Sequence, residues 1–160
     1  MGTSIDQIFD GFPYPTLTPI IGEPTFTTMD ALQAEINANA ASLATHLGGG
    51  NHGHLGLVLP PAEYATLAGG TAYAIPTRPA HNAPIPGGAG DVAIANNIWS
   101  RKEEWRVYNE ATMMERALKR LLLAAVDDCY LRAKRDRITG YTTVTTLDLL
   151  THLKEEYGLF

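Results

Sequence analysis

A long stretch without proline or glycine, from Asp91 to Thr139, most constrains what this chain can fold into. Proline and glycine are the residues that most reliably interrupt a helix. Apolar side chains recur in this stretch at spacings of three and four, which is typical of one buried helix face. They are Ile94, Ile98, Trp105, Tyr108, Leu118, Leu121, Leu122, Ala125 and Val126. The pattern predicts a helical half of the molecule that packs against other helices.

This half should contain at least two helices. Asp91 is an N-cap residue type, so we expect the first helix to follow it. A single helix over 92–137 would far exceed the usual three or four turns. We expect a break either over 109–113 or at Asp127-Asp128. The predicted core comprises Trp99, Trp105, Tyr108, Leu118, Leu121, Leu122, Val126, Leu150 and Leu153, with the lone Cys129 inside it.

A second helix is predicted over 28–47. Thr27 is a plausible N-cap, with Asp30 three residues later as an acidic variant of the capping box. Small alanines between its leucines allow close helix contact. Gly48 is the expected left-handed residue that ends this helix.

Shorter elements follow from local signals. Pro61 can open a short helix over 62–67, whereas the apolar run 54–59 fits a strand or an irregular segment equally well. The last helix should begin after Thr145, which caps it together with Asp148, and continue to Tyr157.

The sequence thus predicts a mainly α fold, a compact bundle of about four to six helices. Four prolines within 11–24 favour an extended proline-rich arm over residues 1–24. Residues 25–160 would form one helical domain, interrupted by a long irregular connector over 68–90 that is rich in proline and glycine.

The charge is low and unevenly distributed. Charged residues make up 18% of the chain, below the usual quarter, and the net charge is −5. Residues 1–91 contain seven acids and one base, whereas residues 92–160 are slightly basic. Neither half has the strong basic excess of a typical nucleic-acid-binding domain. The bases over 132–137 are interrupted by Asp136, and we interpret them as a solvated face, with a weak RNA or partner contact as the alternative.

The compartment follows from cysteine use and hydropathy. A single cysteine cannot form an intrachain disulfide, which fits a reducing compartment. The N-terminal residues lack the basic-then-apolar pattern of a signal peptide, so we expect none, and no apolar run is long enough to span a membrane. We expect a cytoplasmic protein without membrane partners.

His52 and His54, separated by one glycine, are the only tempting metal pair. No acid lies beside them, and glycines surround them, so we favour a polar glycine-rich turn over a metal site. No other residues form a set that could share a mechanism. We therefore expect no enzyme activity, no metal and no cofactor; a metal-dependent hydrolase using His52 and His54 is the alternative.

Several segments together resemble a known family. They are INANAASLATHLGGGNHGHLGLVLPPAEYATL, the spacing W-x5-W-x2-Y, ALKRLLLAAV, and RITGYTTVTTLDLLTHLKEEYG. In this order they resemble the Gag-like capsid proteins of copia-type LTR retrotransposons, over about residues 24–158. The resemblance implies an N-terminal capsid-type region whose copies pack into a shell around the RNA of the element. It also implies RNA binding through a further C-terminal region that this sequence lacks.

Self-association would need exposed apolar groups outside the helical core. The candidates are Phe12, Tyr14 and Ile20 in the arm and Tyr73 and Ile75 in the connector. Deleting residues 1–24 is then expected to weaken self-association more than thermal stability. For the arm we favour packing on the helices of its own domain, with docking on a neighbouring copy as the alternative. A domesticated adaptor that binds a host protein would use similar surfaces.

Overall fold

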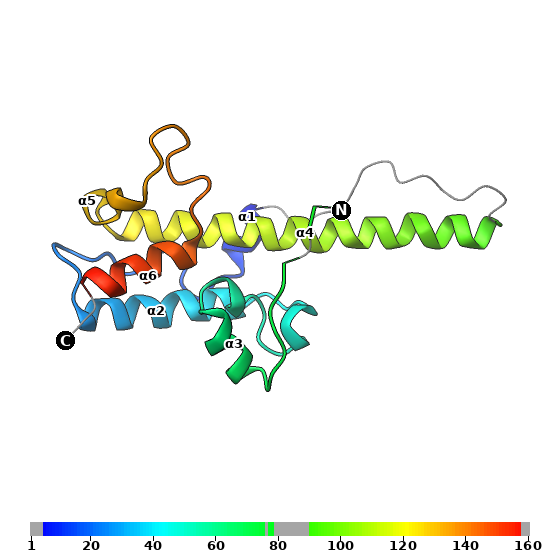
Figure 1. Ribbon diagram of the computed structural model, residues 1–160, viewed down its shortest axis with the longest axis horizontal. Helices are drawn as coiled ribbons and strands as arrows, with labels where there is room; N and C mark the ends of the chain where they lie inside the picture. The colour runs from blue at the N-terminus through cyan, green and yellow to red at the C-terminus, as the bar shows by residue number, and fades with distance from the viewer. Residues whose placement is uncertain (1–4, 76, 79–89, 158–160) are drawn as a thin grey trace.

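The computed structural model describes residues 5–75, 77–78 and 90–157, and this part of the chain is mainly helical, without strands (Figure 1). The mainly α prediction is therefore confirmed. The α-helices are α1 (Ile5–Asp10), α2 (Phe26–Ala41), α3 (Pro61–Leu67), α4 (Asp91–Ala125), α5 (Asp128–Leu131) and α6 (Thr146–Glu156). Short 3-10 turns are η1 (Leu47–Gly49), η2 (Leu55–Leu57) and η3 (Arg132–Lys134).

Helix α4 is one continuous helix of 35 residues, so the break that could have fallen over 109–113 does not occur. The second expected position is correct. Val126 is extended, and the carboxylate of Asp127 accepts a hydrogen bond from the Cys129 N–H at 3.0 Å, which starts α5. At the other end Gly90, and not Asp91, occupies the N-cap position.

Helices α2 and α6 pack against the C-terminal half of α4 and enclose the core (Figure 1). Six of the predicted core residues are buried: Leu118, Leu121, Leu122, Val126, Leu150 and Leu153. The prediction is wrong for Trp99, which is 67% exposed, and for Cys129, which is exposed on α5. Trp105 and Tyr108 are half-buried. Helical periodicity correctly identified the apolar face. The helices packed around the core, here called the body, cover that face only from about Val107 onward.

Helix α2 starts earlier than predicted. The Thr25 hydroxyl accepts the Thr28 N–H at 3.3 Å, and the Thr25 N–H donates to the Thr28 hydroxyl at 2.7 Å. This capping box replaces the expected pair of Thr27 and Asp30. Three threonines stand close together here, so the local signal for a helix start was repeated and its position was ambiguous.

Helix α2 also ends earlier, at Ala41 and not near position 47. The Ser42 hydroxyl donates to the carbonyl of Asn39 at 2.6 Å, and the backbone N–H of His54 donates to the carbonyl of Ala40 at 2.8 Å. A returning segment thus satisfies a carbonyl that the next helical turn would have used. Gly48 is left-handed as predicted, with φ of 63°, but it lies in η1.

Two short predictions are confirmed. Helix α3 begins with Pro61 in its first turn, and Thr145 caps α6 with Asp148 completing the capping box. The run 54–59 contains the 3-10 turn η2 (Leu55–Leu57), with Leu57 and Val58 buried, and is therefore not a strand.

The N-terminal arm contains the short helix α1, followed by an extended segment that packs on the body. Phe12, Leu17 and Ile20 are buried in the core. The amide side chain of Asn39 binds the backbone of Tyr14 in both directions, at 2.9 and 2.8 Å. The arm is thus part of this domain's own packing, which confirms the favoured interpretation.

The expected connector over 68–90 lies mostly outside the described residues, and its start leaves α3 through Gly69 and Gly70 before the chain turns back along the body. Tyr73 packs there against the body. None of the described helices is both long enough and apolar enough to cross a membrane.

Candidate interaction surfaces

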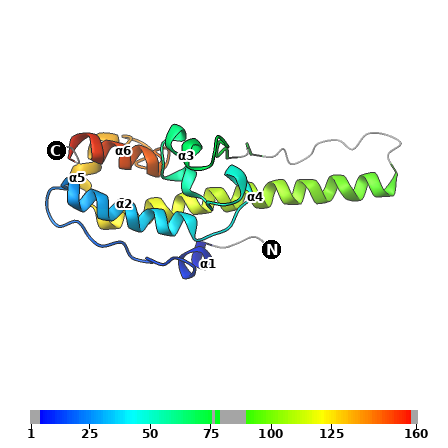
Figure 2. The same ribbon diagram turned by 90° about the horizontal axis from the view of Figure 1, so that it is seen from below.

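The N-terminal part of α4 projects beyond the other described helices (Figures 1 and 2). Val92 is 75% and Trp99 67% exposed, and the first core residue along α4 is Val107. Lys102 and Glu104 are exposed between them. An isolated helical segment of this length is marginal in water, because most helix stability comes from packing an apolar face. In this projecting segment, residues 91–106, the apolar side chains of Val92 and Trp99 are therefore mostly exposed among the described residues.

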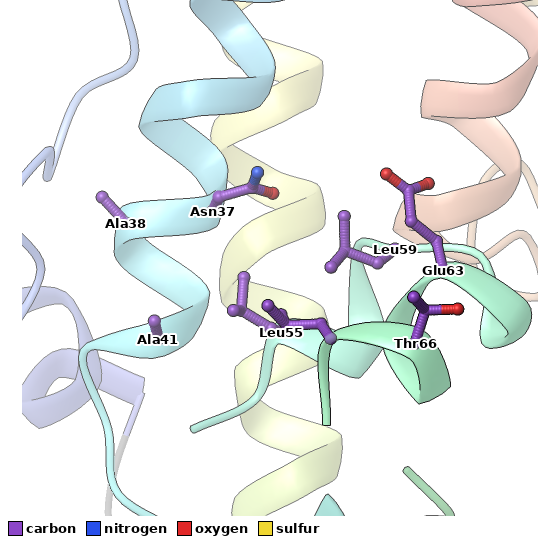
Figure 3. A pocket seen from close by; sticks show the side chains of 8 residues that line it. Asn37, Ala38, Ala41, Leu55, Leu59, Glu63 and Thr66 are labelled. Carbon is purple, nitrogen blue, oxygen red and sulfur yellow. The ribbon is translucent and has the colours of Figure 1, made fainter. Parts of the chain in front are cut away.

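A second surface is an open groove of about 700 Å³ between α2 and α3. In Figure 3 α2 contributes Asn37, Ala38 and Ala41, and Leu55 and Leu59 lie between the two helices. Glu63, Thr66 and Leu67 of α3 complete the lining, with Leu67 half-exposed. The α2–α3 groove is thus apolar at its base, with polar groups at its edges.

A buried polar network anchors the connector beside this groove. The His54 side chain is fully buried, with Nδ1 2.7 Å from the Tyr73 hydroxyl and Nε2 3.4 Å from a Glu110 carboxylate oxygen. Arg106 donates to the other oxygen of Glu110 at 3.2 Å. The rings of Tyr64 and Tyr73 meet edge to face at 5.7 Å.

The protonation of this network follows from its partners. Burial raises the pKa of the Tyr73 phenol well above its usual range, so its hydroxyl stays protonated and donates to His54 Nδ1. With Tyr73 on Nδ1, the Nε2–H of the ring faces a carboxylate oxygen of Glu110. Both ring nitrogens are used inside the protein, which makes His54 a positioning group for Tyr73.

The same geometry is relevant to the alternative interpretation of His52 and His54 as a pair of metal ligands. A metal ion on His54 would have to displace either Tyr73 or Glu110. His52 lies apart from this network, with its ring edge to face with Tyr64 at 6.1 Å. Among the described residues, no group of three or more histidines, cysteines or acids is arranged to hold a metal ion.

The five predicted self-association residues fall into two groups. Phe12 and Ile20 are buried in the monomer, so the premise that they are exposed is wrong: their side chains fill the space between the arm and the helices. Tyr14 and Ile75 are 43% and 47% exposed, and Tyr73 is half-buried in the His54 network. The structure does not gather these residues into one surface.

The projecting segment was not predicted, although the sequence carries a signal for it. Arg101, Lys102, Glu103 and Glu104 are consecutive, so charged side chains surround one complete helical turn. A helix that packs on a core keeps charges off one face. Charges on every side indicate a turn outside the body.

Comparison of the chain with protein-family models, with curated proteins and with solved structures finds no match in any of the three.

Proposed function

We propose that this chain is a structural self-association protein of the Gag or capsid type, whose copies pack in the cytoplasm into a particle shell around RNA. The observation that carries the proposal is the projecting segment of α4 with its exposed Trp99. Burying apolar surface gains about 25 cal/mol per Å², and an indole supplies one of the largest such surfaces among side chains. A second copy would give Trp99 a packing partner beyond those that the described residues of its own chain supply.

The receiving surface in this proposal is the α2–α3 groove of a neighbouring copy. Its volume of about 700 Å³ admits an indole, and its base is apolar. Glu63 at its edge is exposed and acidic, whereas exposed Lys102 lies one helical turn from Trp99. Seating Trp99 in the groove would bring these opposite charges to the same edge of the contact.

This contact is heterologous, because the surface on one copy differs from the surface on the other. Heterologous contacts repeat from copy to copy and generate closed rings or continuing assemblies, not simple dimers. Such geometry suits a shell. The resemblance to Gag-like proteins supports the same function from the sequence.

Light scattering behind size-exclusion chromatography, over a range of protein concentration and salt, tests the proposal, followed by electron microscopy of any large species. The average molar mass of the wild-type protein in solution should increase with its concentration, and this increase is the growth referred to below. Trp99→Ala should shift this growth to higher concentration without lowering thermal stability. Ile138→Ala is the matched control, because Ile138 is 91% exposed on a loop away from both surfaces.

A mixing experiment tests the groove separately. Ala41→Trp fills the groove and should also block growth. Mixing it with Trp99→Ala should give species no larger than dimers, because only one pair of intact surfaces remains. Growth of Ala41→Trp as in wild type would remove the groove from the proposal. A strict monomer under every condition would contradict self-association and leave the adaptor alternative.

A further inference from the structure

Two adjoining hollows lie along α4, from the end of the projecting segment into the half of the helix that packs into the body. One, of about 470 Å³, is lined by Arg116, Lys119, Arg120 and Leu123 together with Tyr141 and Thr142 of the loop before α6. The other, of about 330 Å³, is lined in part by Arg78, Trp105, Tyr108 and Arg116. Arg116 lines both, so the two hollows form one continuous surface, termed here the cationic face.

Neutral groups hold two of its bases in place. The Lys119 ammonium donates to the carbonyl oxygens of Tyr141 at 3.0 Å and Thr142 at 3.3 Å. The guanidinium of Arg120 lies 5.6 Å from the centre of the Phe9 ring. These contacts restrict the side chains without cancelling their charge. The entropy cost of ordering them is thus partly met before any ligand binds.

The carboxylates of this half of α4 are hydrogen-bonded to groups outside the two hollows. Glu110 is in the His54 network, and Glu115 accepts hydrogen bonds from the N–H and the hydroxyl of Thr146 at 2.6 and 2.9 Å. Glu115 also senses the charge of Lys119. Arg116 and Arg120 therefore carry most of the uncompensated charge. No carboxylate is among the described residues that line the two hollows.

Aromatic rings stand among these bases. The Arg78 guanidinium lies 5.7 Å from the centre of the Trp105 ring, and Tyr108 meets Trp105 edge to face at 6.0 Å. Nucleic-acid bases stack on such rings whatever their sequence, and arginine adds cation–π attraction. An acidic peptide would use the cations but would gain little from the rings.

We propose that the cationic face binds single-stranded nucleic acid, with phosphates on Arg116 and Arg120 and a base stacked on Trp105. From residue 105 to residue 120 the face extends roughly 22 Å along the helix axis, which is long enough for several nucleotides. The inference deepens the proposed function by placing nucleic-acid contact on this chain, and its chemistry holds for a monomer as well. Because the chain is acidic overall, the attraction is local and should weaken steeply with salt.

Fluorescence anisotropy tests the affinity, using labelled oligouridine and oligodeoxythymidine of about 16 nucleotides and a duplex of the same length. Protein concentrations stay below those at which light scattering detects association, so failure of self-association leaves this test intact. Arg116→Glu should weaken single-strand binding by about tenfold or more. Lys154→Glu makes the same change of charge on α6, outside both hollows, and should change binding less than twofold.

The salt dependence and the tryptophan emission supply independent readouts. Each lost phosphate contact should reduce the slope of log K against log salt by about 0.7, so Arg116→Glu should flatten it by that amount. Trp99→Phe leaves Trp105 as the single tryptophan, and its emission should be quenched by oligouridine. In Trp105→Phe the remaining Trp99 should show no quenching.

Binding of RNA alone, DNA alone or both supports the proposal and identifies the source of the ligand. Preference for the duplex, or equal displacement by polyglutamate, would overturn it in favour of general anion attraction. A loss of affinity in Arg135→Glu but not in Arg116→Glu would also overturn it, since the site would then be the exposed loop over 132–137.

Discussion

The Nε2 atom of His54 lies 3.4 Å from a carboxylate oxygen of Glu110, although the two residues are 56 positions apart in the sequence. Both side chains are buried, and the Tyr73 hydroxyl satisfies the other ring nitrogen. This contact connects the turn after α2 to the middle of α4. It holds the start of the connector through Tyr73, next to the α2–α3 groove.

Replacing Glu110 should show what this buried acceptor contributes. Glu110→Leu leaves the buried N–H of His54 without an acceptor and should lower the free energy of unfolding by about 1–3 kcal/mol. Glu110→Gln keeps an acceptor oxygen of the same reach and should cost clearly less. Urea denaturation followed by circular dichroism measures both. Equal losses would mean that the carboxylate charge, and not the hydrogen bond, stabilises the network.

Glu115 should make stability depend on pH. Burial raises the pKa of its carboxyl, while hydrogen bonds from Thr146 and the charge of Lys119 act in the opposite direction. Since the folded state holds this proton more tightly than the unfolded state, the contribution is present below the unfolded pKa and is lost as pH rises through the folded pKa. Glu115→Gln keeps the acceptor for Thr146 and removes the titration.

The measurement is the free energy of unfolding of both proteins between about pH 4 and 7. The difference between Glu115→Gln and wild type should shift in favour of the variant as pH rises. A difference that stays constant over this range would contradict the raised pKa. Glu115→Ala is the control for the hydrogen bonds: it should be less stable than Glu115→Gln at every pH, because the Thr146 N–H loses its acceptor.

Local signals correctly predicted features of the fold that depend only on residues close together in the sequence. The capping box of Thr145 and Asp148 is complete within four residues, and Pro61 opens α3 by its own geometry. The early end of α2 at Ala41 depends on the returning N–H of His54, which no local pattern contains. Local chemistry therefore predicted the starts of α3 and α6, whereas the end of α2 depends on a tertiary contact.

The candidate site was harder to predict, because exposure is a property of the whole fold. Trp99 and Trp105 have the same apolar character and both suit the buried stripe of a helix. The body covers α4 only from about Val107, so Trp99 is exposed and Trp105 is half-buried. Phe12 and Ile20 show the reverse error: they were candidates for exposed self-association residues, but both are buried in the core. Arg116 and Arg78 meet in one hollow only through tertiary packing.

The burial of the arm reverses the expectation for deleting residues 1–24. Phe12 is 6% exposed, and Phe12→Ala should lower the free energy of unfolding by about 3–5 kcal/mol. Tyr14→Ala is the matched control, because the Tyr14 ring is 43% exposed and only its backbone binds Asn39. Deletion of the whole arm should therefore lower the melting temperature strongly. Thermal denaturation with unchanged midpoints for Phe12→Ala and the deletion would restore the expectation that the arm contributes little to thermal stability.

Gly48 and Gly69 offer a matched pair for separating backbone strain from close packing. Both are left-handed, with φ of 63° and 69°, and alanine is strained there by about 1–2 kcal/mol. A Cβ on Gly69 meets no atom within 4 Å, whereas a Cβ on Gly48 would collide with the Tyr64 phenol, whose hydroxyl donates to the Gly48 carbonyl at 2.8 Å. Gly48→Ala should therefore cost roughly 2–5 kcal/mol, and Gly69→Ala only the strain. Equal costs in urea denaturation would show that Tyr64 moves aside freely, and the edge-to-face contact between Tyr64 and Tyr73 would then contribute little to holding the connector.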